Sequence, residues 1–221
     1  EKKFARDVMR SFFDFVVDIA RTSRMSAKEL GELVEEVEGL EEYRAVRARK
    51  CGAILVTAHL GTFEAGLAAL AGAENKVRVV FKRDSVAGFE QIRSKLRDSL
   101  GVIEAPIDDG VGTWLALREA LLNDEVVVMQ GDRAVPGQKS EVVPFLHGHL
   151  RLPTGPVRLA QLTGSPIIPV FALPSKDRRY RVLLKPAIEA QVGNGGANAM
   201  LRSLADAIAS VVKEHPEQWL A

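Results

Sequence analysis

The first 22 residues carry apolar side chains at helical spacing. This spacing of three or four residues runs through Phe4, Val8, Phe12, Phe15 and Ile19. It predicts an amphipathic helix over residues 2–22. Ser26 followed by Glu29 is a capping-box pattern, which predicts a second helix from there to about residue 37.

From residue 53 onward, short apolar runs alternate with amphipathic stretches that are long enough for helices. Residues 53–58 form an almost wholly apolar run that ends in a turn, which is typical of a strand covered on both faces. Further strands are expected at residues 77–81, 102–104, 126–129, 167–172 and 180–184. Helices are expected at residues 63–71, 87–99, 111–122, 153–162 and 198–213, with a Gly- and Pro-rich loop over residues 131–152.

Strands that alternate with helices form βαβ units, so we expect a mostly parallel sheet with helices on both faces. The sequence contains no internal repeat and no convincing interdomain linker. We therefore expect a single α/β domain over residues 1–221. Its first part, residues 1–45, is expected to be a helical segment, and residues 50–219 are expected to form the core that carries the chemistry.

The composition excludes several classes of protein. Hydrophobic residues make up 47% of the 221 residues, which excludes a disordered chain. Lys and Arg number 30 against 29 Asp and Glu, whereas a dedicated nucleic-acid-binding protein usually has a strong basic excess. The single cysteine, Cys51, excludes an internal disulfide and fits a reducing compartment.

The sequence also lacks an apolar run of the roughly 20 residues that a membrane-spanning helix needs. The best candidate, residues 12–20, is interrupted by Asp14 and Asp18. Because the sequence begins with Glu1 rather than Met, we expect it to start inside the natural chain, so that a signal or membrane anchor can precede it.

A candidate site lies where the strand at residues 53–58 ends. His59 stands at the strand end, Gly61 lets the backbone turn, and Glu64 falls in the first turn of the next helix. Ligands collect at the carboxyl ends of strands in α/β sheets, and an imidazole beside a carboxylate is an oriented base. The alternative is a histidine that merely ends a strand and a glutamate that the helix dipole favours.

Five blocks of the sequence, in order, resemble the lipid A lauroyl/myristoyl acyltransferase family, and together they cover roughly residues 50–219. The first block, Thr-Ala-His-Leu-Gly-Thr-Phe-Glu at residues 57–64, is similar to the HxxxxE motif of that family. The other blocks lie at residues 130–133, 143–160, 163–170 and 215–219. The resemblance implies a glycerolipid-acyltransferase-like fold.

The resemblance also implies transfer of a fatty acyl group from a thioester to a hydroxyl of a lipid or glycolipid. In that reaction His59 would be the general base on the acceptor hydroxyl, and Glu64 would be the carboxylate that orients it. Backbone N–H groups near Gly61, or a nearby cation, would stabilise the oxyanion. The thioester is already activated, so the reaction needs no metal, no cofactor and no covalent enzyme intermediate.

Two departures from the family pattern bear on binding. Where the family has an arginine, this sequence offers both Lys82 and Arg83, either of which can hold a phosphate of the donor or of the acceptor headgroup. Both can also be solvated residues at a strand end. Asp132 and Arg133 are expected to pair and shape the pocket, with a plain surface salt bridge as the alternative.

The second departure is the His147-x-His149 pair, which lacks a third metal ligand at a sensible spacing. Cys51 has no adjacent histidine, which disfavours a nucleophilic thiol, and the sequence has no GxSxG elbow. We therefore expect no metal site.

The expected partners are acyl carrier protein or acyl-coenzyme A as donor, a glycolipid such as a lipid A precursor as acceptor, and a membrane surface, but no nucleic acid. The expected location is the cytoplasmic face of the bacterial inner membrane. Two alternatives remain open: a thioesterase or other hydrolase on the same fold, and an inert family member that binds lipid. The wide apolar arc of residues 2–22 is expected to contact the membrane, unless the helix is wedged against the sheet.

Overall fold

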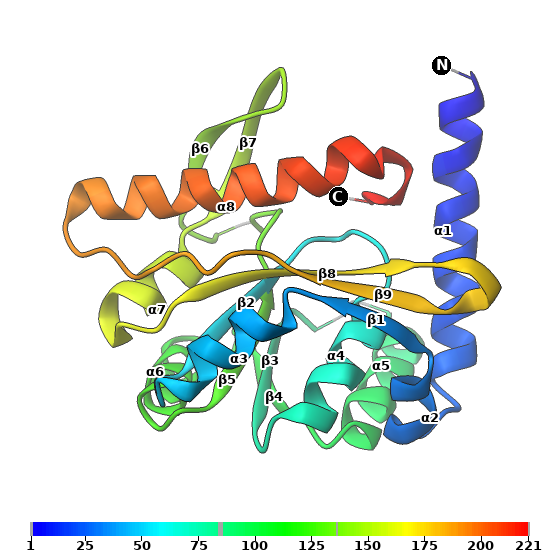
Figure 1. Ribbon diagram of the computed structural model, residues 1–221, viewed down its shortest axis with the longest axis horizontal. Helices are drawn as coiled ribbons and strands as arrows, with labels where there is room; N and C mark the ends of the chain where they lie inside the picture. Colours follow the sequence, from blue (N-terminus) through cyan, green and yellow to red (C-terminus); the bar gives the residue numbers. More distant parts are fainter. Residues whose placement is uncertain (1, 84–85, 136, 221) are drawn as a thin grey trace.

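A seven-stranded sheet forms the centre of the computed structural model, which describes residues 2–83, 86–135 and 137–220. Its strand order is β1-β9-β8-β2-β5-β3-β4 (Figure 1). The strands are β1 (Val34–Glu38), β2 (Ala53–Thr57), β3 (Val77–Phe81), β4 (Ile103–Pro106), β5 (Val126–Gln130), β8 (Ile167–Pro174) and β9 (Tyr180–Leu184). All neighbouring strands are parallel except β8 and β9, which confirms the predicted single α/β domain with a mostly parallel sheet.

Helices cover both faces of this sheet. The α-helices are α1 (Lys2–Thr22), α2 (Ala27–Glu32), α3 (Leu40–Ala48), α4 (Phe63–Ala73), α5 (Ala87–Ser99), α6 (Val111–Leu122), α7 (Gly155–Thr163) and α8 (Asn194–Glu214). One apolar core lies between the sheet and helices α6, α7 and α8, whereas a second core lies between the opposite face and helices α2 to α5. Alternate residues of β2 enter the two cores, with Ile54 and Val56 in the first and Ala53 and Leu55 in the second.

Two segments of the chain form strands where we expected other structure. β1 lies within the predicted second helix, which ends as α2 at Glu32. The glutamates of β1 favour a helix by themselves, but the strand pairs with β9, where Arg181 Nε lies 2.6 Å from Glu36 Oε2. Tertiary pairing thus overrides the local preference.

The second difference is the antiparallel hairpin of β6 (Ser140–Phe145) and β7 (Gly148–Pro153), which occupies the predicted loop. Val143 and Phe145 alternate with exposed residues and enter the core, but the surrounding glycines and prolines hide this period in the sequence.

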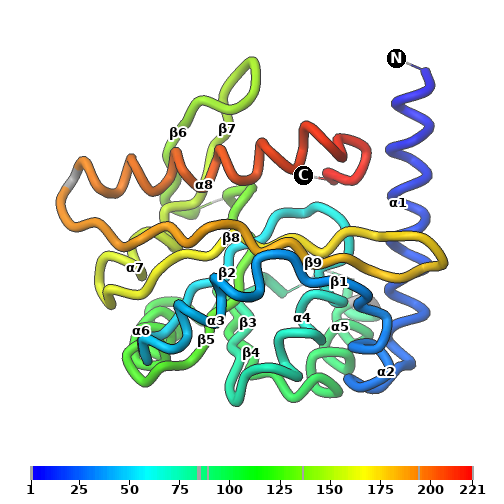
Figure 2. The backbone as a smooth tube through the Cα atoms, in the orientation of Figure 1, coloured from blue at the N-terminus to red at the C-terminus, as the bar shows by residue number. Residues whose placement is uncertain are grey.

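Helix α1 stands at one end of the sheet, beside the turn between β8 and β9, and its N-terminal half extends beyond the body (Figure 2). One face of the helix is buried, at Ser11, Ile19 and Thr22. A second apolar face is exposed and consists of Met9, Phe12, Phe13, Val16 and Val17. Within the described ranges, no helix combines the length and the hydrophobicity that crossing a membrane requires.

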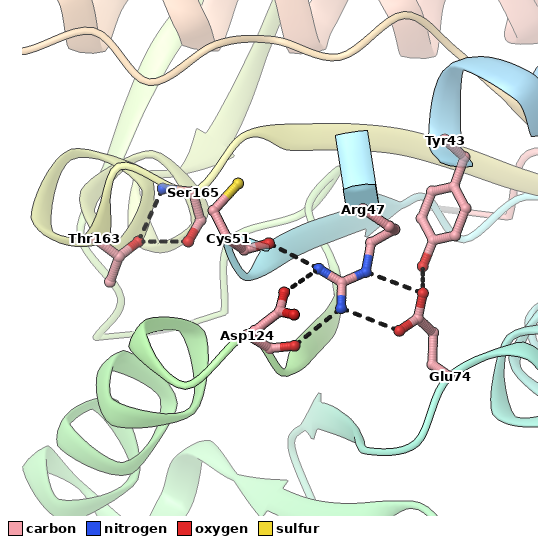
Figure 3. A network of polar contacts seen from close by, with 7 residues as sticks. All are labelled: Tyr43, Arg47, Cys51, Glu74, Asp124, Thr163 and Ser165. Carbon is pink, nitrogen blue, oxygen red and sulfur yellow. Dashed lines mark hydrogen bonds and ion pairs between the residues drawn. The ribbon is translucent and has the colours of Figure 1, made fainter. Parts of the chain in front are cut away.

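A polar network joins α3 to the end of the sheet at which strands β2 and β5 begin (Figure 3). The Arg47 guanidinium donates to both carboxylate oxygens of Glu74 at 3.0 and 3.1 Å, to Asp124 Oδ1 at 2.6 Å and to the Cys51 carbonyl oxygen at 2.7 Å. Tyr43 donates its hydroxyl proton to the same Glu74 carboxylate at 2.7 Å. The network therefore joins α3 to the end of α4 and to the loops before β2 and β5.

Candidate active site

The chain turns sharply between β2 and α4, and this corner positions His59. Gly61 has φ +68°, and a Cβ atom there would lie 2.1 Å from the carbonyl oxygen of Ala172 on β8. Only glycine fits such a close approach in the left-handed region. The corner can therefore fold tightly against β8, and Gly61 makes the turn that we expected there.

Neighbouring strand β5 brings a carboxylate to the same corner. Gly131 donates its N–H to the Thr57 carbonyl oxygen at 2.8 Å, and a Cβ at Gly131 would lie 2.4 Å from Val56 Cγ1. The next residue, Asp132, points to His59, with Oδ1 2.8 Å from the ring atom Nδ1. Its Oδ2 accepts the backbone N–H of His59 at 2.9 Å. The Asp132 side chain is fully buried, while that of His59 is 26% exposed.

The partners of the His59 ring define its proton positions. A carboxylate only accepts hydrogen bonds, so Nδ1 carries the proton that Asp132 accepts. An Arg133 guanidinium nitrogen lies 3.3 Å from Nε2, and because a guanidinium only donates, Nε2 holds the lone pair. The neutral imidazole thus presents a basic nitrogen on the side of Arg133.

The Asp132 carboxylate is held in its charged form. Burial by itself raises its pKa, but hydrogen bonds from the His59 ring, the His59 N–H and the Trp219 indole outweigh burial and lower the pKa below its usual value. A buried anion beside Nδ1 fixes the tautomer of the ring and stabilises the imidazolium that forms when Nε2 takes a proton.

Glu64 has a different environment from the one we expected. It lies in the first turn of α4, is 4% exposed, and its Oε2 atom has no hydrogen-bond partner among the described residues. Burial raises the pKa of the Glu64 carboxyl, and the charges of Arg93 and Arg97 oppose this only in part. The place beside the His59 ring that we assigned to Glu64 is therefore occupied by Asp132.

The N–H of Gly61 is also engaged, because it donates to the Gln218 carbonyl oxygen at 3.2 Å. It is thus not free to stabilise an oxyanion in this structure. Of the two kinds of donor that we expected, the cation has the better position, since Arg133 lies beside the reactive nitrogen of His59.

His59 opens into a cavity of about 400 Å³ at the carboxyl ends of β3 and β5. Four cations line it, namely Lys82, Arg83, Arg93 and Arg133, and no carboxylate belongs to the described lining. Arg83 forms an ion pair with Asp109 at 2.6 Å, although half of its side chain is exposed. The structure thus brings together His59, Lys82, Arg83 and Arg133 in one positively charged cavity. The expected ion pair between Asp132 and Arg133 is absent from the described residues, because Asp132 contacts His59 and Trp219 while Arg133 contacts the far nitrogen of His59.

A larger cavity of about 610 Å³ lies between the sheet and helices α3 and α4. Its lining is mainly apolar and includes Leu67, Leu70, Val170 and Val182. A narrow space of about 20 Å³, lined by Glu64, shares Phe63 and Leu67 with the larger cavity and shares Phe81 and Arg93 with the cavity of His59. Both larger cavities have sizes typical of ligand sites, about 300–1,000 Å³.

Two residues near the site escaped the sequence analysis as separate candidates. Arg93 lies on α5 and faces the cavity of His59, but a lone arginine in a charged helix gives no signal. Trp219 donates its indole N–H to Asp132, although only the block at residues 215–219 pointed to that segment. Among the described residues, no three His, Cys, Asp or Glu side chains are grouped to hold a metal ion.

Comparison with known proteins identifies the family of the chain. The family model described as bacterial lipid A biosynthesis acyltransferase matches residues 1–221. The chain is 26% identical over 213 residues to a phosphatidylinositol mannoside acyltransferase of Mycobacterium tuberculosis, a match that covers 96% of this chain and 66% of the relative. A protein of the same name from Mycolicibacterium smegmatis is 23% identical over 215 residues, covering 97% of this chain and 69% of the relative. The chain thus spans about two thirds of the length of these relatives, and it belongs to the bacterial lipid A biosynthesis acyltransferase family.

Proposed function

We propose that this protein transfers a fatty acyl group from an acyl thioester to a hydroxyl of a glycolipid. The observation that carries the proposal is the His59–Asp132 pair, whose basic Nε2 atom faces a cavity lined by four cations. Membership of an acyltransferase family supports the reaction type.

In the proposed reaction, Nε2 of His59 removes the proton of the acceptor hydroxyl as its oxygen attacks the thioester carbonyl carbon. The new C–O bond forms, and the carbonyl oxygen becomes an oxyanion. When the oxyanion collapses, the C–S bond breaks and the departing sulfur takes the proton from Nε2. His59 returns to its starting state, so each turnover is balanced without a metal or an acyl-enzyme.

Asp132 and Arg133 would supply the electrostatics. Asp132 stabilises the imidazolium, as a buried carboxylate does beside a catalytic histidine. The Arg133 guanidinium, which lies 3.3 Å from Nε2, would give up this contact to the acceptor hydroxyl and donate to the carbonyl oxygen as it becomes the oxyanion. This assigns to a side chain the role that we first gave to backbone N–H groups near Gly61.

The remaining cations would bind phosphate. Coenzyme A and acyl carrier protein carry a phosphate at the end of the pantetheine arm that is remote from the thioester, and many glycolipid acceptors carry a phosphate near their sugar. Arg93, Arg83 and Lys82 line the cavity with Nε2 of His59 and can hold such a group. The relatives that act, by name, on phosphatidylinositol mannoside favour a phosphorylated glycolipid acceptor, with a lipid A precursor as the other candidate.

The hydrocarbon chain of the donor would occupy the apolar cavity between the sheet and α4. Its lining is predominantly apolar, and the narrow space beside Glu64 adjoins both cavities. Burial raises the pKa of the Glu64 carboxyl at this place, although Arg93 and Arg97 line the same space. In this role Glu64 shapes the passage instead of orienting His59.

The exposed apolar face of α1 would rest on the membrane that holds the acceptor. Met9, Phe12 and Phe13 are each about half exposed, although the opposite face of the helix is already buried. An uncovered apolar stripe beside a buried one marks an interaction surface. We place the protein on the cytoplasmic face of the bacterial inner membrane, where acyl carrier protein and coenzyme A are found.

The test is an assay with radiolabelled palmitoyl-coenzyme A or palmitoyl-acyl carrier protein, with and without vesicles that contain phosphatidylinositol mannoside or a lipid A precursor. The proposal predicts an acylated glycolipid that forms only with the acceptor. Release of free palmitate at the same rate with and without acceptor would identify a thioesterase. No turnover with any pair, while the lipids still bind, would identify an inert lipid-binding protein and overturn the proposal.

A further inference from the structure

The segment that follows α8 folds back over the corner that carries His59. Leu220 donates its N–H to the His59 carbonyl oxygen at 2.7 Å, and Gly61 donates its N–H to the Gln218 carbonyl oxygen at 3.2 Å. Leu60 and Trp219 form the antiparallel bridge between these two bonds. Residues 218–220 therefore pair with residues 59–61 as a short added strand.

This pairing places the Trp219 side chain on the buried carboxylate of the site. The indole Nε1–H donates to Oδ2 of Asp132 at 3.0 Å, while Oδ1 of the same carboxylate accepts the hydrogen bond from Nδ1 of His59. The indole also packs against Phe145, with ring centroids 5.3 Å apart. The Asp132 side chain has no exposure to water, so its hydrogen bonds must come from the protein.

We infer that Trp219 is a positioning residue for the reaction, acting through Asp132. With Oδ2 held by Trp219 and by the His59 N–H, the carboxylate cannot rotate, and Oδ1 stays directed at Nδ1. The catalytic consequence of this contact rests on the proposed function, whereas the contact itself does not.

Packing alone gives an incomplete account of this tryptophan. Phenylalanine would keep an aromatic ring beside Phe145, but it cannot donate to a buried anion. Hydrogen bonds to charged groups are stronger than neutral ones, and a buried anion that loses a donor is destabilised. The site therefore uses the indole N–H group of Trp219 as well as its ring.

The same segment is attached to α1. Gln218 Nε2 donates to the hydroxyl oxygen of the buried Ser11 at 3.1 Å, while the backbone of Gln218 accepts from Gly61. The helix with the exposed apolar face thus helps to hold the strand that carries Trp219 in register.

The first test replaces Trp219 by phenylalanine and, separately, by 3-benzothienylalanine, which keeps the bicyclic shape but has sulfur in place of the N–H group. Both variants should fold like the parent by circular dichroism and lower kcat about tenfold or more, with little change in KM for the thioester. If the benzothienyl variant retains the kcat of the parent, Trp219 acts by packing alone and the inference is overturned.

The second test is independent of turnover. The chain has two tryptophans, Trp114 and Trp219, so a ¹⁵N-indole spectrum contains two side-chain signals. We expect the Trp219 signal to move as His59 is titrated and the movement to disappear in His59→Ala. The other charged groups that line the cavity are Lys82, Arg83, Arg93 and Arg133.

A Trp219 signal whose chemical shift changes neither with pH nor in the His59→Ala variant would contradict the inference. The expected coupling in a protein that shows no acyl transfer would instead count against the proposed function and leave the Trp219–Asp132–His59 contact in place. The two failures are therefore distinguishable.

Discussion

The carboxylate oxygen Oδ1 of Asp132 lies 2.8 Å from Nδ1 of His59, although 73 residues separate the two in the sequence. This contact gives His59 a fixed tautomer and a buried counter-charge, which are the requirements for a general base. It also shows that the two carboxylates near the corner have different roles. Asp132 serves the histidine, and Glu64 lies buried without a partner for Oε2 in the described structure.

The first prediction compares these carboxylates. Asp132→Asn should lower kcat for acyl transfer on the order of 10³–10⁴-fold, because the amide removes the charge that stabilises the imidazolium. Glu64→Gln should cost at least tenfold less, because Asp132 and not Glu64 contacts the His59 ring. Steady-state kinetics of both variants with one thioester and one glycolipid would reveal the order. A larger loss in Glu64→Gln than in Asp132→Asn would return the orienting role to Glu64.

The second prediction concerns the apolar cavity. Ala69→Phe adds a ring to its lining and should shift the preference of the enzyme toward shorter acyl thioesters. Ala116→Phe, on the exposed side of α6, is the matched control and should leave the preference unchanged. Competition between thioesters of different chain lengths, read by mass spectrometry of the product, measures the preference. An unchanged chain-length profile in Ala69→Phe would remove the acyl chain from this cavity.

The third prediction concerns the exposed face of α1. The double substitution Phe12→Ser/Phe13→Ser should reduce flotation of the protein with phospholipid vesicles, because binding there depends on apolar area. The control is Val111→Ser/Leu115→Ser, which removes two exposed apolar side chains from α6. Equal flotation of the two double variants and the parent, all with native circular dichroism, would show that α1 does not contact the membrane.

The fourth prediction concerns the network around Arg47. Arg47→Met leaves the Glu74 carboxylate buried without its guanidinium and should lower the free energy of unfolding by roughly 3 kcal/mol, the lower end for buried pairs. Arg44→Met on the same helix removes an exposed ion pair with Glu41 and should change the free energy of unfolding by less than about 1 kcal/mol. Urea unfolding of both variants measures the difference. Equal effects would mean that the network contributes no more than a surface ion pair.

Local patterns in the sequence were enough to predict much of this fold. The β3 and β9 strands and helices α1, α5 and α6 begin and end where their hydrophobic periods predict. The second helix begins after the capping box of Ser26 and Glu29, as predicted, but it ends at Glu32 and not near residue 37. Its expected last turn is β1, which depends on pairing with β9, a strand about 145 residues away in the chain. The hairpin was missed because its alternation is short and is flanked by glycine and proline.

The site was harder to predict for the same physical reason. His59 stands out because it ends an apolar strand before a glycine turn, and its neighbours along the chain can be read locally. Its partner depends on strand order, which places β5 beside β2 and so brings Asp132 to the ring. Sequence proximity favoured Glu64 instead. The indole of Trp219 reaches Asp132 only because the chain folds back after α8, which no local pattern indicates.

The most direct test of the account is the rate of acyl transfer by His59→Ala, measured with saturating palmitoyl thioester and glycolipid vesicles. His59 ends a strand at the edge of a cavity and is partly exposed, so the variant should fold like the parent. Loss of the general base should lower kcat by about 10²–10⁴-fold, while both substrates still bind. A folded His59→Ala protein that transfers acyl groups within a few-fold of the parent rate would contradict the assignment of His59 as the catalytic base.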